Sequence, residues 1–331
     1  MNYRTKKKLI HNFGKYGLYG LSRLLTRKYP RVLMYHRFSA NGVGDGLPVK
    51  AFEAQMKLVA NNFNPITLDH LCECRKKSAN LPDNPVIITV DDGYQDFYDL
   101  AYPILKRYSI PATIYITVNF IEQKIWLWPD KVTYVLKQIN EPVLHTAFID
   151  KIDTCDTVNK DSREVAWNYI IGKCISMAPD ARDSYIHELA SAAGVSMPEF
   201  PPEDYAGMTW LQVRELSDNG IDIGAHTCNH PILSKIPDDQ LIDEIDGCKR
   251  RIEANIGRNV NNFCYPNGRR DDYNSSIKEM IIASGYETAA TSFYDKDGCN
   301  DLFELRRHGV GNDMYHFQRV INGIEYLGTW L

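Results

Sequence analysis

Two segments of the chain carry side chains capable of catalysis. In each segment these side chains come directly after a predicted strand. The first segment is Val86-Ile-Ile-Thr-Val-Asp91-Asp92-Gly93, a buried-type strand that ends in two adjacent carboxylates and a glycine. Neighbouring side chains on an extended chain point to opposite sides, so both carboxylates serve one site only if the backbone turns. Gly93 permits such a turn. Taken alone, Asp-Asp-Gly is most often an ordinary turn.

The second segment runs from Ile221 to Pro231 with the sequence Ile-Asp-Ile-Gly-Ala-His-Thr-Cys-Asn-His-Pro. It begins as a strand and ends with His226 and His230, four residues apart. This spacing places both imidazoles on one side of an extended or a helical segment. A lone pair of this kind usually lies on the surface. Together with the Asp-Asp-Gly strand end, it predicts a His-His-Asp metal site with an open coordination position.

These two motifs resemble those of the polysaccharide deacetylases of the NodB-homology type, carbohydrate esterase family 4. Thr-Val-Asp-Asp-Gly is similar to the first motif of that family and His-Thr-Cys-Asn-His-Pro to the second. The segment that leads from Met208 to Gly224 is also typical of the family. The resemblance extends roughly from Arg31 to Val310, apart from an insertion described below.

The resemblance implies an α/β fold, a distorted (β/α)7-type barrel, and a metal-dependent hydrolase that removes an acetyl group from an N-acetylated sugar. In these terms Asp91 is the general base, and Asp92, His226 and His230 hold a divalent metal, with Zn²⁺ expected. Such a site suits the reaction because an amide carbonyl is a poor electrophile. A metal polarises it while a carboxylate takes the proton of the attacking water.

The third motif departs from the family pattern. Many members carry Arg-Pro-Pro-Tyr-Gly, whereas this chain has Cys-Tyr-Pro-Asn-Gly, so Cys264 stands where the family has an arginine that orients the base. Arg306 or Arg307 is a candidate for the missing cation, although surface positions are the simpler expectation for both. Tyr265 and Asn267 are expected beside the substrate, with a backbone N–H near Asn267 as the oxyanion donor.

Two histidines are candidates for the general acid that protonates the leaving amine. His36, in Leu-Met-Tyr-His-Arg, resembles the N-terminal histidine of the family branch that acts on biofilm-type polysaccharides. His308 stands near the position where other branches have their acid. We prefer His36, because the sequence around His308 fits a structural role about as well as it fits the role of the acid.

The elements that must position these residues follow a strand-helix alternation typical of a parallel sheet. Seven strands with intervening helices fit a barrel. The predicted strands are Val32–Tyr35, Val86–Val90, Thr113–Thr117, Ile221–Ala225, Asn262–Tyr265, Glu287–Thr291 and Arg307–Val310. The predicted helices are Ala51–Asn61, Phe97–Tyr108, Thr209–Asn219, Asp238–Ile256 and Tyr273–Ser284.

The segment from about 126 to 205 interrupts this alternation and is predicted to be a mostly helical insertion in a barrel spanning 31–331. Barrel chemistry takes place on loops at the carboxyl ends of the strands, so the insertion is a candidate for shaping the substrate cleft. A subdomain that serves only packing is equally consistent with its sequence.

The composition is that of a globular protein, with 331 residues, 44% apolar and 24% charged, which excludes disordered, collagen-like and coiled-coil chains. Ten Lys or Arg and no acidic residue precede Asp45, so the body of the chain is net acidic. That balance argues against a nucleic-acid partner. The basic leader, residues 1–30, suits an anionic membrane.

The leader has apolar residues at helical spacing but neither a membrane-spanning run nor a clean signal peptide. It is predicted to be an amphipathic helix, either in a membrane interface through residues 1–28 or docked on the body. The eight cysteines form no C-x-x-C and no regular framework, which favours reduced thiols. We therefore expect a cytoplasmic protein, peripheral on the inner face of the membrane if the leader binds lipid.

Two alternatives to deacetylation stay open from the sequence. The same barrel can hydrolyse another non-peptide C–N bond, or the protein can be an inactive sugar-binding or membrane-associated relative. The expected substrate is an N-acetylated carbohydrate used in surface polysaccharide or glycoconjugate biosynthesis. A lipid-linked or nucleotide-linked sugar is consistent with the expected location.

Overall fold

A curved sheet of parallel strands forms the centre of the computed structural model, which describes residues 17–40, 46–139, 143–144, 155–156, 160–295 and 297–327. The strand order is β11-β10-β9-β6-β5-β1-β12, and the short β4 (Asn64–Pro65) also pairs with β5. Each of the seven predicted strands is present. Their bounds are β1 (Arg31–Tyr35), β5 (Pro85–Val90), β6 (Ala112–Ile116), β9 (Asp222–Ala225), β10 (Asn262–Cys264), β11 (Thr288–Ala290) and β12 (His308–Gly309).

The sheet closes irregularly, as expected for a distorted barrel. β12 pairs with β1, with Leu33 opposite His308. The residues just before β12 lie next to β11, where a regular barrel would have a full strand. There Leu305 donates its N–H to the carbonyl of Ala289 at 2.9 Å and accepts from the N–H of Thr291 at 2.9 Å. Backbone hydrogen bonds therefore join the two ends of the sheet.

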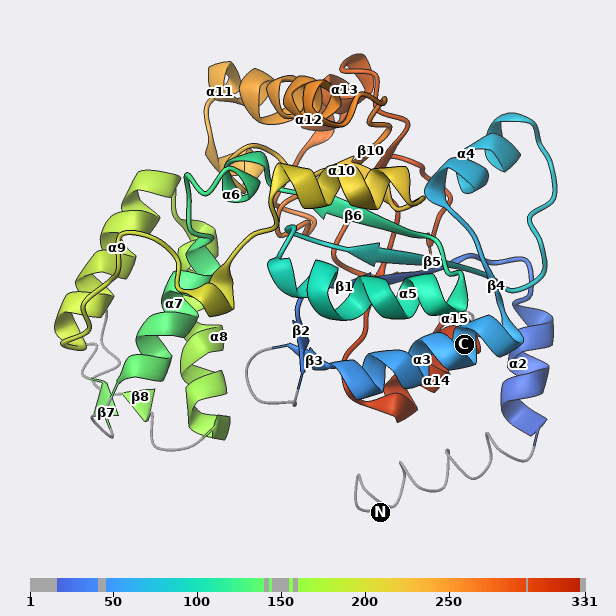
Figure 1. The fold of residues 1–331 in the computed structure, drawn as a ribbon, viewed down its shortest axis with the longest axis horizontal. Coiled ribbons are helices and arrows are strands. Elements are labelled where there is room, and N and C mark those ends of the chain that lie inside the picture. The colour runs from blue at the N-terminus through green and yellow to red at the C-terminus, as the bar shows by residue number, and fades with distance from the viewer. Residues whose placement is uncertain are drawn as a thin grey trace.

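Helices cover the outside of the sheet, and Figure 1 shows α3, α5 and α10 lying across the strands. All five predicted helices are present. The bounds of the covering helices are α3 (Val49–Asn62), α4 (Leu68–Lys76), η2 (Phe97–Ala101), α5 (Tyr102–Tyr108), α6 (Val118–Ile121), α10 (Trp210–Asp218), α11 (Asp238–Ile242), η5 (Asp243–Gly247), α12 (Cys248–Ile256), α13 (Ser275–Ala283) and α14 (Met314–Ile321). Each residue of β5 is buried, because helices cover one face and the barrel interior covers the other.

Local signals explain where several of these helices begin and end. Thr209 and Gln212 form a reciprocal capping box at the start of α10, and the Asn274 side chain caps α13. α12 ends at Gly257, whose φ of +68° is left-handed. Cys72 and Cys74 lie in α4, and both thiols are free.

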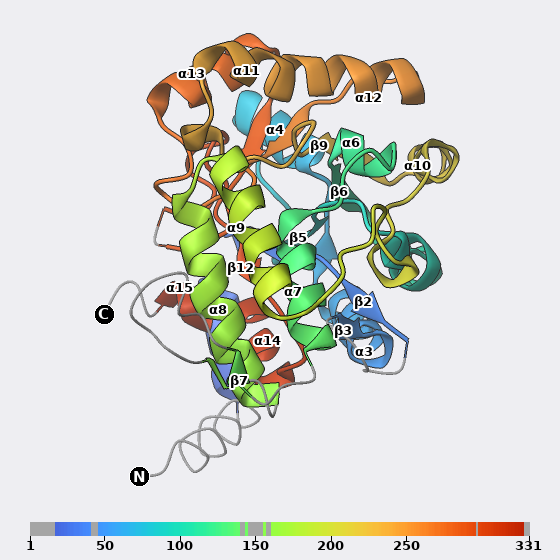
Figure 2. The same ribbon diagram turned by 90° about the vertical axis from the view of Figure 1, so that its left-hand side faces the viewer.

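The insertion contributes three helices, α7 (Trp128–Gln138), α8 (Lys160–Ser176) and α9 (Pro179–Ala192), and the short strands β7 (Val143–Leu144) and β8 (Cys155–Asp156). They surround a hydrophobic core of their own, which includes Val132, Ile170 and Ile186. This core is separate from that of the barrel. In Figure 1 these helices lie to the left of the sheet, and in Figure 2 they lie in front of it.

Only the end of the leader falls within the described residues. The helix α2 (Tyr19–Leu25) contacts α15 (Ile324–Leu327), while residues 1–16 lie outside the described part. Leu18, Leu21, Leu24 and Leu25 are between 46% and 60% exposed. Among the described residues, no helix is both long and apolar enough to cross a membrane.

Candidate active site

A left-handed turn after β5 brings Asp91 and Asp92 to one pocket. Asp92 itself has φ of +80° and Gly93 has φ of +95°, so the predicted turn begins at the second aspartate. The N–H of Thr117 donates to the Asp92 carbonyl at 3.1 Å and holds the turn. A Cβ on Gly93 would lie 2.9 Å from Ile121 Cδ1. The turn therefore requires glycine at this position for both conformation and space.

A second strained loop follows β9 and carries the two histidines. Thr227 and His230 have φ of +67° and +55°, values that non-glycine residues seldom adopt. The Thr227 hydroxyl accepts from the His230 N–H at 3.0 Å. The loop thereby turns His230 back toward His226, with 4.8 Å between their ring centroids.

Glu244 holds this loop from outside, and the sequence analysis missed it. Its buried carboxylate accepts from the N–H groups of Cys228 at 2.8 Å and Asn229 at 3.0 Å. Glu244 is one of several acidic residues in a long helical segment, so nothing in its local sequence distinguishes it. Only the tertiary packing of η5 against the loop reveals the contact.

Asp92, His226 and His230 fit the donor set of a divalent metal site. Asp92 Oδ1 lies 3.5 Å from His226 Nε2 and 3.4 Å from His230 Nε2, and all three residues are buried. His226 Nδ1 lies 2.8 Å from the Cys264 carbonyl. A proton on Nδ1 therefore donates to that carbonyl and leaves the Nε2 lone pair for a metal.

The electrostatics of Asp92 and His230 agree with these roles, whereas Cys264 and Asp92 raise the pKa of His226 in spite of its burial. Burial opposes the charge of Asp92, but hydrogen bonds from His226 and His230 outweigh it and hold the pKa of Asp92 well below 3.8. Burial lowers the pKa of His230, which favours the neutral imidazole that a metal requires.

Asp91 forms a buried, two-pronged ion pair with Arg307. Arg307 Nη1 lies 2.6 Å from Asp91 Oδ1, Nη2 lies 2.7 Å from Oδ2, and the arginine is 1% exposed. Burial opposes ionisation of Asp91, yet the guanidinium outweighs it and lowers the pKa of Asp91. Arg307 therefore supplies the cation that Cys264 cannot.

The expectation of surface positions for Arg306 and Arg307 is wrong. Arg306 is also buried, and it pairs with Asp295 and Glu304 instead of the site. Cys264 Sγ lies 3.1 Å from Arg307 Nη2, and burial raises the pKa of this thiol. A neutral thiol is a poor metal ligand. Cys264 therefore packs beside the ion pair.

The structure brings His36 to the pocket and leaves His308 outside it. His36 Nε2 lies 3.6 Å from Asp91 Oδ2, and its side chain is 46% exposed. His308 follows Arg307 on β12, so it points to the opposite side of the strand. There it stacks on Tyr294 with 3.7 Å between centroids, and burial lowers its pKa to about 3. This environment disfavours His308 as the acid.

The third motif leaves a hydrogen-bond donor at the pocket. Asn267 has φ of +61°, and within the described chain neither its backbone N–H nor its Nδ2 has a hydrogen-bond partner. Tyr265 also lines the pocket, but its hydroxyl donates to the Phe303 carbonyl at 3.0 Å and its ring stacks on Tyr273. Asn267 is therefore the better candidate for an oxyanion donor.

The insertion closes one side of this pocket, whose volume is about 390 Å³. Trp128, Trp167 and Ile171 form an apolar wall opposite the carboxylates and histidines. Trp167 Nε1 donates to Thr133 Oγ1 at 2.9 Å, which fixes α8 on α7. The insertion thus packs as a subdomain and also shapes the cleft.

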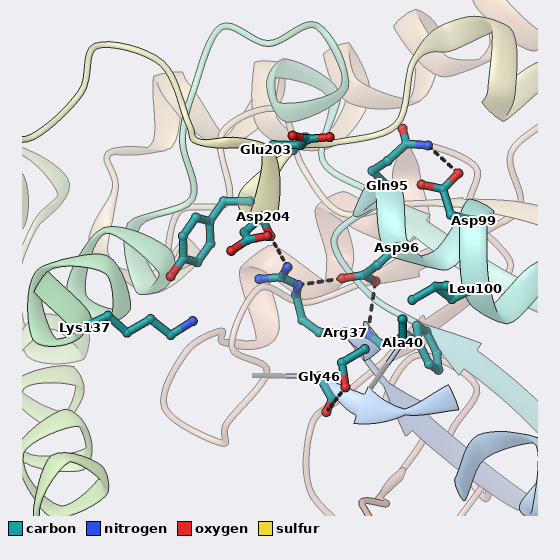
Figure 3. A pocket seen from close by; sticks show the side chains of 14 residues that line it. Arg37, Ala40, Gly46, Gln95, Asp96, Asp99, Leu100, Lys137, Glu203 and Asp204 are labelled. Carbon is teal, nitrogen blue, oxygen red and sulfur yellow. Dashed lines mark hydrogen bonds and ion pairs between the residues drawn. The ribbon is translucent and has the colours of Figure 1, made fainter. Parts of the chain in front are cut away.

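Arg37, the residue after His36, ties the insertion to the barrel. Its Nε lies 2.8 Å from Asp96 Oδ2, its Nη1 lies 3.8 Å from Asp130 Oδ1 on α7, and it donates to the Asp204 carbonyl. Figure 3 shows Arg37 between Asp96 and Asp204 in a neighbouring pocket. Arg37 therefore fixes both the backbone that carries His36 and the wall opposite it.

Known proteins resemble this chain in sequence and in fold. The family model for polysaccharide deacetylases matches residues 78–169 and 177–289. A polysaccharide deacetylase of Bacillus subtilis, YxkH, is 38% identical over 94 residues, which are 28% of this chain and 33% of that protein. The poly-β-1,6-N-acetyl-D-glucosamine N-deacetylase of Staphylococcus aureus is 36% identical over 74 residues, 22% of this chain and 25% of that protein. The matches thus span a third or less of these relatives.

Solved structures share the fold at low sequence identity. The Streptococcus pyogenes deacetylase PplD, solved with acetate, has a TM-score of 0.57 at 18% identity, covering 87% of this chain and 95% of that one. IcaB from Ammonifex degensii has a TM-score of 0.57 at 14% identity, covering 89% of this chain and 97% of that one.

Replacing Arg307 with Met should leave the Asp91 charge buried and unpaired. We expect the free energy of unfolding in urea to fall by roughly 3–5 kcal/mol, the usual cost of breaking a buried pair. Arg258→Met is the matched control, because its 3.0 Å pair with Asp218 is exposed and such pairs contribute about 1 kcal/mol or less. Equal losses in the two variants would contradict the assigned role of Arg307.

Proposed function

Because the chain belongs to the polysaccharide deacetylase family, we propose that it is a metal-dependent hydrolase that removes an acetyl group from an N-acetylated sugar. The main support is one observation. A single pocket holds the Asp91–Arg307 pair and the Asp92, His226 and His230 donors. A binding protein that had lost its activity would have no need for both sets.

The donor set of two imidazoles and one carboxylate suits Zn²⁺. A divalent cation held there would polarise the acetamide carbonyl and make an attacking water more acidic. Asp91 accepts the proton of that water. The lowered pKa of Asp91 keeps its carboxylate ionised but makes it a weak base. Proton transfer to Asp91 therefore depends on the water being made more acidic.

The remaining residues stabilise charge and complete the bond exchange. As the water oxygen bonds to the carbonyl carbon, the backbone N–H of Asn267 donates to the developing oxyanion. His36 then protonates the sugar nitrogen while the C–N bond breaks. The products are acetate and a free amino sugar. The exposed side chain of His36 can exchange protons with solvent between turnovers.

The substrate we propose is an N-acetylated carbohydrate of surface polysaccharide or glycoconjugate biosynthesis, attached to a lipid or a nucleotide. We further propose that residues 1–28 contact an anionic membrane from its cytoplasmic side. The support is the acid-free basic leader and the exposed leucines. Leu18, Leu21 and Leu25 follow a spacing that places them on one helix face.

Metal binding is predicted to require both histidines. In a His226→Ala/His230→Ala variant two of three donors are gone, so we expect loss of most bound metal, measured by elemental analysis of the purified protein. Asp91→Asn should keep its metal, because it leaves the donors in place. A double variant that still holds one metal ion per chain would place the site elsewhere.

Acetate release is predicted to require Asp91. Mass spectrometry of reactions with UDP-sugars, lipid-linked N-acetyl sugars and chitooligosaccharides should detect acetate from at least one of them. With that substrate, Asp91→Asn should lower turnover by roughly 10²- to 10⁴-fold, since a general base is lost. Normal turnover in this variant would show that another group takes the proton. No acetate from any substrate would argue against the proposed function.

Membrane contact is predicted to depend on charge and on the exposed leucines. The full chain should sediment with anionic vesicles at low salt and be released at high salt, because salt screens the attraction. A chain that starts at Pro30 should stay in the supernatant. Leu21→Ser/Leu25→Ser should weaken sedimentation, whereas Leu211→Ser, exposed on α10, should not. If the full chain ignores anionic vesicles, the leader does not bind membranes.

A further inference from the structure

Another pocket, distinct from the one shown in Figure 3, lies beside the catalytic pocket on the other side of Trp128. Its volume is about 290 Å³, and Trp128 lines both pockets. Trp126, Lys131 and Arg182 also line it, and half of its lining residues belong to the insertion. We call it the Arg182 pocket. Neither the sequence motifs nor the proposed chemistry uses it.

Three buried residues that line this pocket carry hydrogen-bond donors that have no acceptor within the described chain. These donors are Nε and Nη1 of Arg182 and the indole Nε1 atoms of Trp126 and Trp128. The three residues are only 5%, 6% and 4% exposed. Buried polar groups in native proteins are nearly always paired. Four unpaired donors around one pocket therefore indicate a ligand that supplies acceptors.

The acidic groups of the pocket are engaged elsewhere. Glu244 accepts from the backbone N–H groups of Cys228 and Asn229, in the loop that carries the two histidines. Asp183 is half exposed and lies 3.7 Å from Lys131 Nζ. Neither carboxylate is within ion-pair distance of the Arg182 guanidinium, which leaves this charge without a counter-ion among the described residues.

The environment of Arg182 makes this charge costly. Its guanidinium lies 4.8 Å from the ring centre of Trp128, so the indole face stabilises its charge but accepts none of its in-plane N–H bonds. Burial lowers the pKa of Arg182 and outweighs the opposite effect of the neighbouring Asp183 carboxylate. The planar N–H edge of an arginine matches an oxyanion such as phosphate or carboxylate.

We propose that the Arg182 pocket binds an oxyanion, and that this group is a phosphate carried by the substrate. The second part rests on the proposed deacetylase function, since it places the phosphate next to the catalytic pocket across Trp128. The substrate class is then an N-acetylated sugar phosphate or its ester. Arg182, Trp126 and Trp128 determine this specificity.

Binding of the anion alone tests the first part. We expect inorganic phosphate to raise the thermal unfolding temperature of the full chain in a saturable way, compared with chloride at equal ionic strength. Arg182→Met keeps an apolar side chain over Trp128 but removes the charge, so the shift should vanish. Arg214→Met, a surface arginine on α10 that bonds Asn255, should keep it.

Two results would overturn the anion site. One is the absence of a phosphate effect in the natural chain, and the other is an equal effect in Arg182→Met, which would place the phosphate outside the Arg182 pocket. If Arg182→Met does not fold, Trp126→Phe replaces it as the test, because it removes one N–H donor and keeps a ring. Its phosphate affinity should be lower than that of the natural chain.

Kinetics test the second part and separate it from the proposed function. N-acetylglucosamine 1-phosphate should have a KM about 10- to 100-fold below that of methyl N-acetylglucosaminide, the range for charged hydrogen bonds. Arg182→Met should abolish this difference by raising KM for the sugar phosphate, whereas Arg214→Met should preserve it. Equal KM values in the natural chain would overturn the phosphate assignment while the deacetylase function stands. Phosphate binding through Arg182, without acetate release from either sugar or from any substrate named under the proposed function, would overturn the function and keep the anion site.

Discussion

The ion pair between Asp91 and Arg307 is the interaction on which both the fold and the site depend. Arg307 precedes β12, and its Nε donates to the Thr291 carbonyl at 2.6 Å while Nη1 donates to Thr89 Oγ1 at 3.0 Å. One side chain thus joins β5, the end of β11 and the start of β12, where the barrel lacks a regular strand pair. Closure of the sheet and ionisation of the base are therefore coupled, because the charge of Asp91 is tolerated in the interior only when the barrel has closed.

The proposed metal donors depend on a different kind of support. Asp92, Thr227 and His230 adopt left-handed backbone conformations that cost free energy, and surrounding contacts must hold them. Thr227 supplies one such contact within the loop and Glu244 supplies others from η5. Strain is concentrated where the donors converge, and the regular strands and helices around them carry the burial energy that offsets it.

The sequence located the main strands, five of the helices and the residues proposed as metal donors, because these have local signatures. Periodic patterns located the seven strands and five helices, and spacing at two strand ends located Asp91, Asp92, His226 and His230. Contacts between distant segments have no such signature. Arg307 lies 216 residues from Asp91 and Glu244 lies 16 residues from Cys228, so only the folded chain reveals either pairing. The sequence already favoured His36 over His308 as the acid, and the fold adds that His308 lies outside the pocket that His36 lines.

The two pockets have opposite electrostatic requirements, and Trp128 separates them. In the catalytic pocket Arg307 neutralises Asp91, so the carboxylate of Asp92 and two imidazoles are left to hold a cation. In the adjacent pocket the buried cation of Arg182 lacks an anion among the described residues. Each charge is costly to bury alone, so each requires a partner of opposite sign. A phosphate-bearing amide substrate with a bound divalent cation would meet both requirements at once, which gives the insertion a role in selecting the substrate as well as in covering the barrel.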